Sequence, residues 1–181
     1  CQGAGFLTSD DGLAYLEGEV RSMDEESWTG IVDVGSKPVV SREAIATGLL
    51  ILSEEGIDVV VNGRSPKGDV REASTVAAIQ AVKETPRTLP HCHPIPIEGC
   101  TVDWGVEENG LRCTVSVRTH WTTGVEMEAL CGVNAGLLCA WDMRKRIETE
   151  PQGQYPTSRM QGARKSVVSG KSVDLRVGGH I

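Results

Sequence analysis

The stretch from Thr123 to Arg146 constrains the fold most strongly, because it predicts one long amphipathic helix. Thr123 and Glu126 have the spacing of a capping box, in which each side chain accepts a hydrogen bond from the other residue's amide. The apolar positions that follow recur every three or four residues, at Leu130, Val133, Leu137 and Trp141. Small residues lie among them at Gly132, Ala135, Gly136 and Ala140. A helix with this face can pack closely against another backbone.

The rest of the sequence supplies strands. Residues Ile97–Val106 and Leu111–Thr119 are predicted as two strands, and the Asn-Gly pair between them is a strong hairpin signal. We expect three more strands, at Ile31–Val34, at Ser41–Leu52 and at about Lys165–Ser169. These segments would form the sheet of the molecule.

Two further helices are predicted in the first half of the chain. Ser53 begins one that ends at Val61, and Asp69 can cap a second that runs to about Thr85. The inner face of the second helix would carry Val70, Ala73, Ala77 and Ala81. The resulting order, β-β-α-α-β-β-α-β, predicts an α+β fold with helices on one face of a largely antiparallel sheet.

Composition excludes several classes of function. The 181 residues carry a formal net charge of -7, which disfavours a general surface for nucleic acid or anionic membranes. No apolar run is long enough to span a membrane, and no basic-then-apolar leader is present, so we expect a cytoplasmic protein. Residues 1–30 are acidic and poorly periodic; we expect a mobile tail, with Met23 as a candidate native start. Residues 31–181 would then form a single domain.

The run from Leu89 to Pro94, LPHCHP, raises the question of a metal site. In an extended segment His91 and His93 point to one side and Cys92 to the other. Two imidazoles are too few for zinc, which takes three or four protein ligands. The remaining candidates fit no known ligand spacing: Cys100, Cys113 and His120. We therefore interpret the run as a rigid shelf beside a bound molecule, and we expect no metal there.

Other segments suggest anion chemistry without deciding it. Residues Arg64–Asp69 form a loop that enters a helix, where backbone amides and basic side chains favour an anion. The loop lacks the pattern of a P-loop, and solvated loop charges explain it more simply. Asp142 and Lys145 lie three residues apart, as in an ordinary helical ion pair. Individually, each feature has a structural explanation.

Six motifs, however, occur together in one order: VDV, KGDV, AAIQAVK, LPHCHP, TGVEMEAL and WDMRK. This order resembles the MoaC family, the cyclic pyranopterin monophosphate synthases of molybdenum cofactor biosynthesis. The resemblance covers about Ile31 to Val173, and TGVEMEAL followed by DMRK is its most specific part. The QYP at Gln154 to Pro156 is similar to archaeal members.

The resemblance implies a ferredoxin-like subunit that assembles as a hexamer, a trimer of dimers, with active sites at the dimer interface. It implies a phosphorus-oxygen lyase whose substrate is 3',8-cyclo-7,8-dihydroguanosine 5'-triphosphate. The products would be cyclic pyranopterin monophosphate and diphosphate. No redox cofactor is expected, although Mg²⁺ can accompany the triphosphate.

The resemblance also implies roles for particular residues. Catalytic roles fall on Asp142, Lys145 and Lys67. Substrate contacts fall on His91, Cys92, His93, Met127 and Glu128, with Glu126 supporting them and Lys171 near the triphosphate.

Some positions depart from the family pattern. Ser65-Pro66 stand where histidines are common before KGD, and His91 replaces an apolar residue. Arg144 replaces a common cysteine, and Trp121-Thr122 stand where bacterial members have Gly-Lys. The last change would remove a phosphate contact, for which Arg64 or Arg118 would compensate.

The implied reaction needs groups that move protons and hold phosphate charge. A lysine transfers protons near neutral pH only where its pKa falls from about 10.4, which a nearby cation favours and a close carboxylate opposes. We expect Lys67 and Lys145 to divide the roles, one holding phosphate and one transferring protons. Asp142 would orient Lys145 or accept a proton from the ribose hydroxyl. Glu128 and His93 would hold the polar edge of the base.

Two alternatives belong to other classes. A catalytically silent family member would bind the nucleotide or pterin as a scaffold subunit. The retained lysines and aspartate argue against this interpretation, because a silent protein has no use for costly buried charges. A zinc hydrolase that uses the histidines of the LPHCHP run ranks lowest, since that run supplies too few ligands.

Overall fold

The computed structural model describes residues 30–169, whose strands form one antiparallel sheet. The strands are β1 (Val40–Ile51), β2 (Gly99–Glu107), β3 (Gly110–Trp121) and β4 (Arg159–Ser169), in the order β2-β3-β1-β4. The helices are α1 (Glu54–Val61), α2 (Val70–Lys83), α3 (Thr85–Thr88) and α4 (Glu126–Glu148). With α1 to α3 as one helical connection, this is the β-α-β-β-α-β arrangement of a ferredoxin-like fold. The predicted fold class is confirmed.

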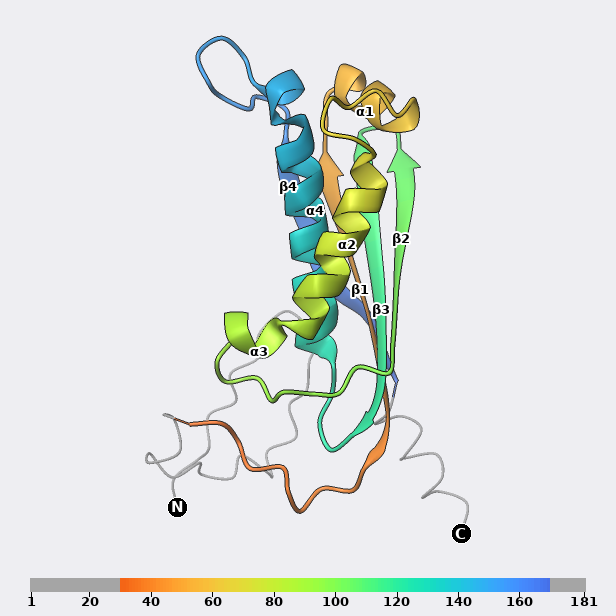
Figure 1. The fold of residues 1–181 in the computed structure, drawn as a ribbon, viewed down its shortest axis with the longest axis vertical. Helices are drawn as coiled ribbons and strands as arrows, with labels where there is room; N and C mark the ends of the chain where they lie inside the picture. The colour runs from red at the N-terminus through yellow and green to blue at the C-terminus, as the bar shows by residue number, and fades with distance from the viewer. Residues whose placement is uncertain (1–29, 170–181) are drawn as a thin grey trace, which may run out of the picture. The chain divides into compact units, whose positions relative to one another are not determined.

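The helices α2 and α4 cover one face of the sheet (Figure 1). That face is apolar, because alternate residues of β3 point toward the helices: Leu111, Cys113, Val115 and Val117 are at most 1% exposed. The residues between them are polar and half-buried or exposed, and they line the face without helices. The strand alternation thus decides where the core lies.

The two long helices approach closely through glycines, as the small residues of α4 predict. A Cβ atom at Gly132 would lie 2.8 Å from Val82 Cγ2, and one at Gly136 would lie 3.3 Å from the Cβ of Ala78. Substitution at either position would push α2 away from α4. The face of α2 that packs here differs by one residue from the predicted face, since the buried positions are Val70, Ser74, Ala78 and Val82. Ala73, Ala77 and Ala81 are only partly buried beside them.

The predicted capping box at Thr123 is wrong. The helix α4 begins later, its N-cap residue is Val125, and no side chain caps it. The carboxylate of Glu126 instead folds back over Gly124, where any Cβ atom would collide with it. The caps predicted for α1 and α2 are confirmed: Ser53 accepts from the amide of Gly56, and Asp69 accepts from the amide of Glu72.

The predicted strand at Ile31–Val34 is also wrong. These residues are irregular, and the chain turns immediately after them, where the amide of Lys37 donates to the carbonyl of Val34. Both edges of β1 are already paired, with β3 and β4, so the segment has no place beside it. The predicted hairpin is confirmed, although its loop is Glu108-Asn109 and Gly110 already pairs with Glu107.

Residues 1–29 and 170–181 lie outside the described part of the chain, and so does the predicted mobile tail. Within residues 30–169, no helix is both long and apolar enough to cross a membrane. The strand predicted at Lys165–Ser169 is confirmed as the end of β4, which begins earlier, at Arg159.

Candidate functional site

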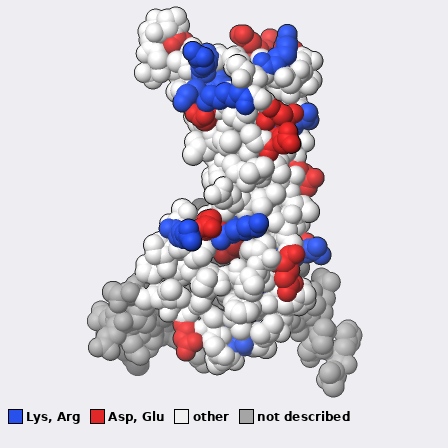
Figure 2. Space-filling view, in the orientation of Figure 1, with Lys and Arg blue, Asp and Glu red and all other residues white. Residues whose placement is uncertain are grey.

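The carboxylate of Asp142 bridges two lysines near the C-terminal end of α4. Its Oδ2 lies 2.6 Å from Nζ of Lys67, and its Oδ1 lies 2.7 Å from Nζ of Lys145. Lys67 also donates to the backbone carbonyl of Asp142 at 3.0 Å. The structure therefore brings together all three residues with predicted catalytic roles, although Lys67 and Asp142 are 75 positions apart. Figure 2 shows basic side chains clustered on this end of the molecule, where the last turns of α4 lie near α1.

The three charged groups are open to solvent. Lys67, Asp142 and Lys145 have side chains that are 39%, 52% and 50% exposed. Hydrogen bonds from Lys145 and Lys67 lower the pKa of Asp142 to about 2, so this carboxylate is ionised throughout the physiological range. The same contact raises the pKa of Lys145, which is opposite to the direction that a lysine base needs. This end of α4 thus presents two positive groups and one fixed carboxylate.

The loop that carries Lys67 is anchored to the same turn of α4. Ser65 is buried, and its hydroxyl donates to the carbonyl of Met143 at 3.5 Å while it accepts from the amide of Lys67 at 3.3 Å. Gly68 has a φ of 97°, a conformation that other residues adopt only with strain. Serine at the position before Pro66 therefore has a structural use here.

A second group lies at the other end of α4. Glu128 is only 3% exposed, and burial raises the pKa of its carboxyl, with the nearby Glu126 adding to the effect and His93 opposing it. Burial, with the charge of Glu128 as a smaller cause, also raises the pKa of Cys92. The structure thus brings the LPHCHP run against the first turn of α4.

The LPHCHP run is held by hydrogen bonds on both sides. His93 Nε2 donates to the carbonyl of Val32 at 2.7 Å, which requires the proton on Nε2. Just after the run, the hydroxyl of Thr119 in β3 donates to the carbonyl of Pro96 at 2.6 Å. These contacts fix the run between the segment before β1 and the end of β3. Among residues 30–169, no three His, Cys, Asp or Glu side chains gather closely enough to hold a metal ion.

Glu128 lines a cavity of about 400 Å³ beside this shelf. Its other walls are mostly apolar or aliphatic, formed by Val82, Lys83, Pro86, Pro94, Ile95, Pro96 and Trp121. A pocket with flat apolar walls, one buried carboxyl and one lysine suits a planar polar ring. A larger hollow of about 980 Å³ lies beside the start of α1, but four glutamates line it and would repel an anion: Glu54, Glu55, Glu107 and Glu108.

The two groups are far apart within one chain. Glu128 and Asp142 are fourteen residues apart on one straight element, which at 1.5 Å per residue separates them by about 21 Å. The resemblance implies active sites at a dimer interface, which does not require the two groups to meet within one chain. We call them the charged half-site (Lys67, Asp142 and Lys145) and the apolar half-site (Glu128 and the walls of its cavity).

The other predicted site residues are distributed over these regions. Met127 is 41% exposed on the outer side of α4, and His91 is exposed on the shelf. Arg64 begins the loop that carries Lys67 (the lysine loop, residues 64–69), and it makes an ion pair with Asp58 of α1. Lys171 lies outside the described residues.

Three residues beside these groups had no predicted role. Lys83 and Trp121 line the cavity of Glu128, and Tyr155 packs edge-on against Trp141 with ring centroids 5.5 Å apart. Tyr155 lies close enough to Lys145 to affect its pKa. Their sequence signals were the AAIQAVK motif, the Trp121 departure and the QYP motif, but none of these indicated which half-site each residue would join.

Comparison with known proteins identifies the family. The model of the MoaC family matches residues 31–163. The chain belongs to the MoaC family. Among its relatives, a protein of Aeropyrum pernix named probable cyclic pyranopterin monophosphate synthase is 45% identical over 141 residues, covering 78% of this chain and 97% of the relative. A protein of the same name from Methanopyrus kandleri is 47% identical over 137 residues, covering 74% and 88%.

One relative has a different name. A protein of Methanothermobacter thermautotrophicus, 41% identical over 140 residues, is named probable cyclic pyranopterin monophosphate synthase accessory protein. The match covers 77% of this MoaC chain and 88% of that relative. Names of both kinds therefore occur at similar identity, so identity alone does not separate a synthase from an accessory subunit.

Proposed function

We propose that this MoaC chain is a cyclic pyranopterin monophosphate synthase, a lyase of molybdenum cofactor biosynthesis. Its substrate would be 3',8-cyclo-7,8-dihydroguanosine 5'-triphosphate, and its products cyclic pyranopterin monophosphate and diphosphate. The observation that carries the proposal is the Asp142 carboxylate between the ammonium groups of Lys67 and Lys145. The names of the archaeal relatives support the substrate and product.

We infer that the active site is completed by a second copy of the chain. A nucleotide triphosphate must meet both a polyphosphate-binding group and a base-binding group, and one copy holds these about 21 Å apart on α4. One stripe along the outer side of α4 is exposed or partly exposed over its whole length, and several of its residues are apolar. The stripe consists of Met127, Cys131, Asn134, Leu138, Trp141, Asp142 and Lys145. Leu138 is 59% exposed, which is unusual for leucine in the middle of a long helix.

A two-fold axis near the middle of this stripe would join the half-sites. Such an axis pairs a surface with itself, so α4 of one copy would run antiparallel to α4 of the other. Glu128 of each copy would lie level with Asp142 of its partner if the axis passes near Ala135, which is halfway between the two residues on α4. We propose that this dimer is the unit of a hexamer, and that the protein works in the cytoplasm, where thiols remain reduced. The five described cysteines are all free.

The charged half-site suits phosphate transfer. Two ammonium groups can stabilise the charge that develops on the departing diphosphate when a ribose hydroxyl attacks the α-phosphorus. Asp142 remains ionised and can accept a hydrogen bond from that hydroxyl and orient it, while its lowered pKa makes it a weak base. Lys145, with its raised pKa, stays protonated and serves as a cation or proton donor, so any lysine base must be another residue. Electrons are not transferred in this conversion, so we propose no redox cofactor, and Mg²⁺ would enter only with the triphosphate.

The apolar half-site suits the ring system. Trp121 and the prolines of the cavity offer flat surfaces, and the buried carboxyl of Glu128 can hydrogen-bond to the polar edge of a guanine-derived ring. His93 is fixed beside it and can act on the same edge. Rigid placement of the ring brings the ribose within reach of the partner's charged half-site.

Direct turnover tests the proposal. The purified protein is incubated with the cyclic nucleotide, and diphosphate release and pterin formation are followed together. Equal amounts of both products are expected from the wild-type protein, and the Lys67→Ala variant should form both roughly 100- to 1,000-fold more slowly. Tight binding of the nucleotide without either product would show that the chain acts as an accessory or scaffold subunit instead.

A further inference from the structure

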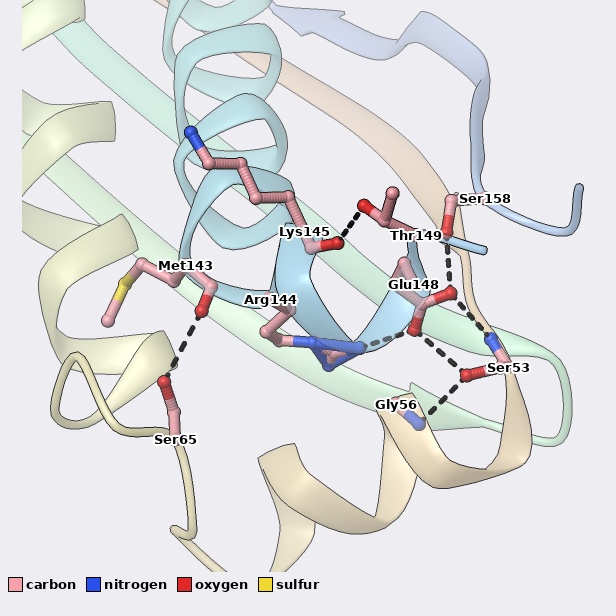
Figure 3. A network of polar contacts seen from close by, with 9 residues as sticks. All are labelled: Ser53, Gly56, Ser65, Met143, Arg144, Lys145, Glu148, Thr149 and Ser158. Atoms are coloured by element: carbon pink, nitrogen blue, oxygen red, sulfur yellow. Dashed lines mark hydrogen bonds and ion pairs between the residues drawn. The ribbon is translucent and has the colours of Figure 1, made fainter. Parts of the chain in front are cut away.

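A buried ion pair lies directly behind the charged half-site. Arg144, between Asp142 and Lys145 in sequence, is 0% exposed, and its Nη2 donates to Oε1 of Glu148 at 2.9 Å. Glu148 is 5% exposed. Figure 3 shows this pair on one side of α4, while Lys145 leaves the helix on the other side.

The carboxylate of Glu148 connects three elements. Its Oε1 also accepts from the hydroxyl of Ser53 at 3.0 Å, and its Oε2 accepts from the amide of Ser53 at 3.1 Å. The hydroxyl of Ser158 donates to the same Oε2 at 2.5 Å. Ser53 is the N-cap of α1, and Ser158 directly precedes β4, so the last turn of α4 is attached to both (Figure 3).

Burying this ion pair costs desolvation free energy, which the contacts of the pair offset only in part. Arg144 Nε and Nη1 are buried, and neither has a hydrogen-bond acceptor among residues 30–169. A buried ion pair with unused donors seldom stabilises a fold more than apolar residues of similar volume would. Gly56 further shows how closely the surroundings fit, because any Cβ atom there would collide with Glu148 and Arg144. A use other than stability is therefore indicated.

We propose that Arg144 and Glu148 are positioning residues that hold the Asp142–Lys145 turn of α4 in place for the reaction. The lysine loop is attached to this turn from the other side, through the contact of Ser65 with Met143. With both attachments present, Asp142 lies between Lys67 and Lys145. Without the one made by Glu148, the end of α4 loses its directional contacts with α1 and β4 and keeps only nondirectional packing. The expected change in kcat rests on the proposed function, whereas the expected change in the position of Asp142 does not.

The test replaces the pair by apolar residues, Arg144→Met with Glu148→Leu. Removing both charges together avoids an unpaired buried charge, so this double variant is expected to fold and assemble. We expect kcat to fall roughly 10- to 100-fold, as for a small misplacement of reacting groups, with KM changed less than about threefold. The carboxyl of Asp142, followed by NMR, should titrate closer to its ordinary pKa of 3.8 than to about 2.

The control is Val133→Ala, which opens a cavity under α4 away from the network. It should lower the melting temperature and leave the titration of Asp142 unchanged. A wild-type titration of Asp142 in the double variant would overturn the proposal, and so would a wild-type kcat in an enzyme that is shown to form pterin. If the wild-type protein forms no pterin, the proposed function fails, and the NMR titration still decides whether the pair positions Asp142.

Discussion

The two ends of α4 use charge in opposite ways. At the C-terminal end Asp142 is half-exposed and held ionised by two lysines, whereas at the N-terminal end Glu128 is buried among mostly apolar walls. The pKa of the first carboxyl is lowered to about 2, and the pKa of the second is raised. The same side-chain group is therefore kept as an anion at one end and shifted toward its neutral form at the other.

Under the proposed function, this difference gives each end a part of the substrate. The open cluster of ammonium groups would bind the strongly charged phosphates, whereas the mostly apolar pocket with its buried carboxyl would bind a ring through shape and a few hydrogen bonds. Because the two carboxyl groups lie at opposite ends of one helix, the surroundings of each can shift its pKa without affecting the other. A dimer of antiparallel α4 helices would bring them together without changing either.

The largest expected effect is on the charged end. Asp142→Asn keeps the shape of the side chain but removes the charge between the two lysines, and we expect kcat to fall roughly 100- to 1,000-fold. Lys67→Ala should do the same, because the departing diphosphate loses a cation. Steady-state kinetics on the assembled protein measure both. Near wild-type turnover in either variant would contradict the catalytic assignment.

Mixing variants tests whether the two ends act across copies. Asp142→Asn and Glu128→Gln are each expected to be nearly inactive alone, but a mixed dimer contains one site with both native residues. After subunit exchange at equal ratio, about a quarter of wild-type activity should return if pairing is random. No recovery, with exchange verified by mass spectrometry, would mean that each site uses one chain only.

Glu128→Gln should separate function from stability. Because the folded pKa of Glu128 is raised above 4.5, the folded state holds its proton more tightly than the unfolded chain, so stability falls as the pH rises through that range. The glutamine variant has no carboxyl proton to release, so it does not lose stability in this way. Its melting temperature should exceed that of the wild type by a few degrees at pH 8, and the difference should vanish near pH 4. An equal difference at both pH values would contradict a buried, proton-retaining carboxyl.

The smallest effect should come from the acid titration of Asp142. Its folded pKa is lowered from 3.8 to about 2, so the unfolded chain takes up the proton first and the contribution to stability is lost between those values. Denaturant unfolding of the wild type and Asp142→Asn should differ slightly at pH 6 and converge as the pH approaches 2. Because all three groups are exposed, high salt should reduce the difference. A difference that changes with neither pH nor salt concentration would exclude the ion pairs as its cause.

Local pattern predicted much of this fold. The hairpin, β1 and the caps at Ser53 and Asp69 follow from turn chemistry, alternation and capping, which involve only neighbouring residues. The same logic failed at Thr123, because α4 begins two residues later than the motif predicts, with Val125 as an N-cap residue that makes no side-chain hydrogen bond. It failed for Ile31–Val34 because a strand needs a partner, and β1, the strand that follows it, is already paired with β3 and β4 by residues far along the chain.

The sequence by itself determined the family, most of the strand and helix order, and Lys67, Asp142 and Lys145 as candidate site residues, because motifs and periodicity are properties of neighbours along the chain. Only the tertiary structure decided that these residues and Glu128 occupy opposite ends of one helix. It alone revealed the attachment of Glu148 to Ser53, 95 positions away, and the burial of Arg144. Burial and long-range contacts set the charge state and position of a side chain, and both depend on residues that meet only when the chain folds.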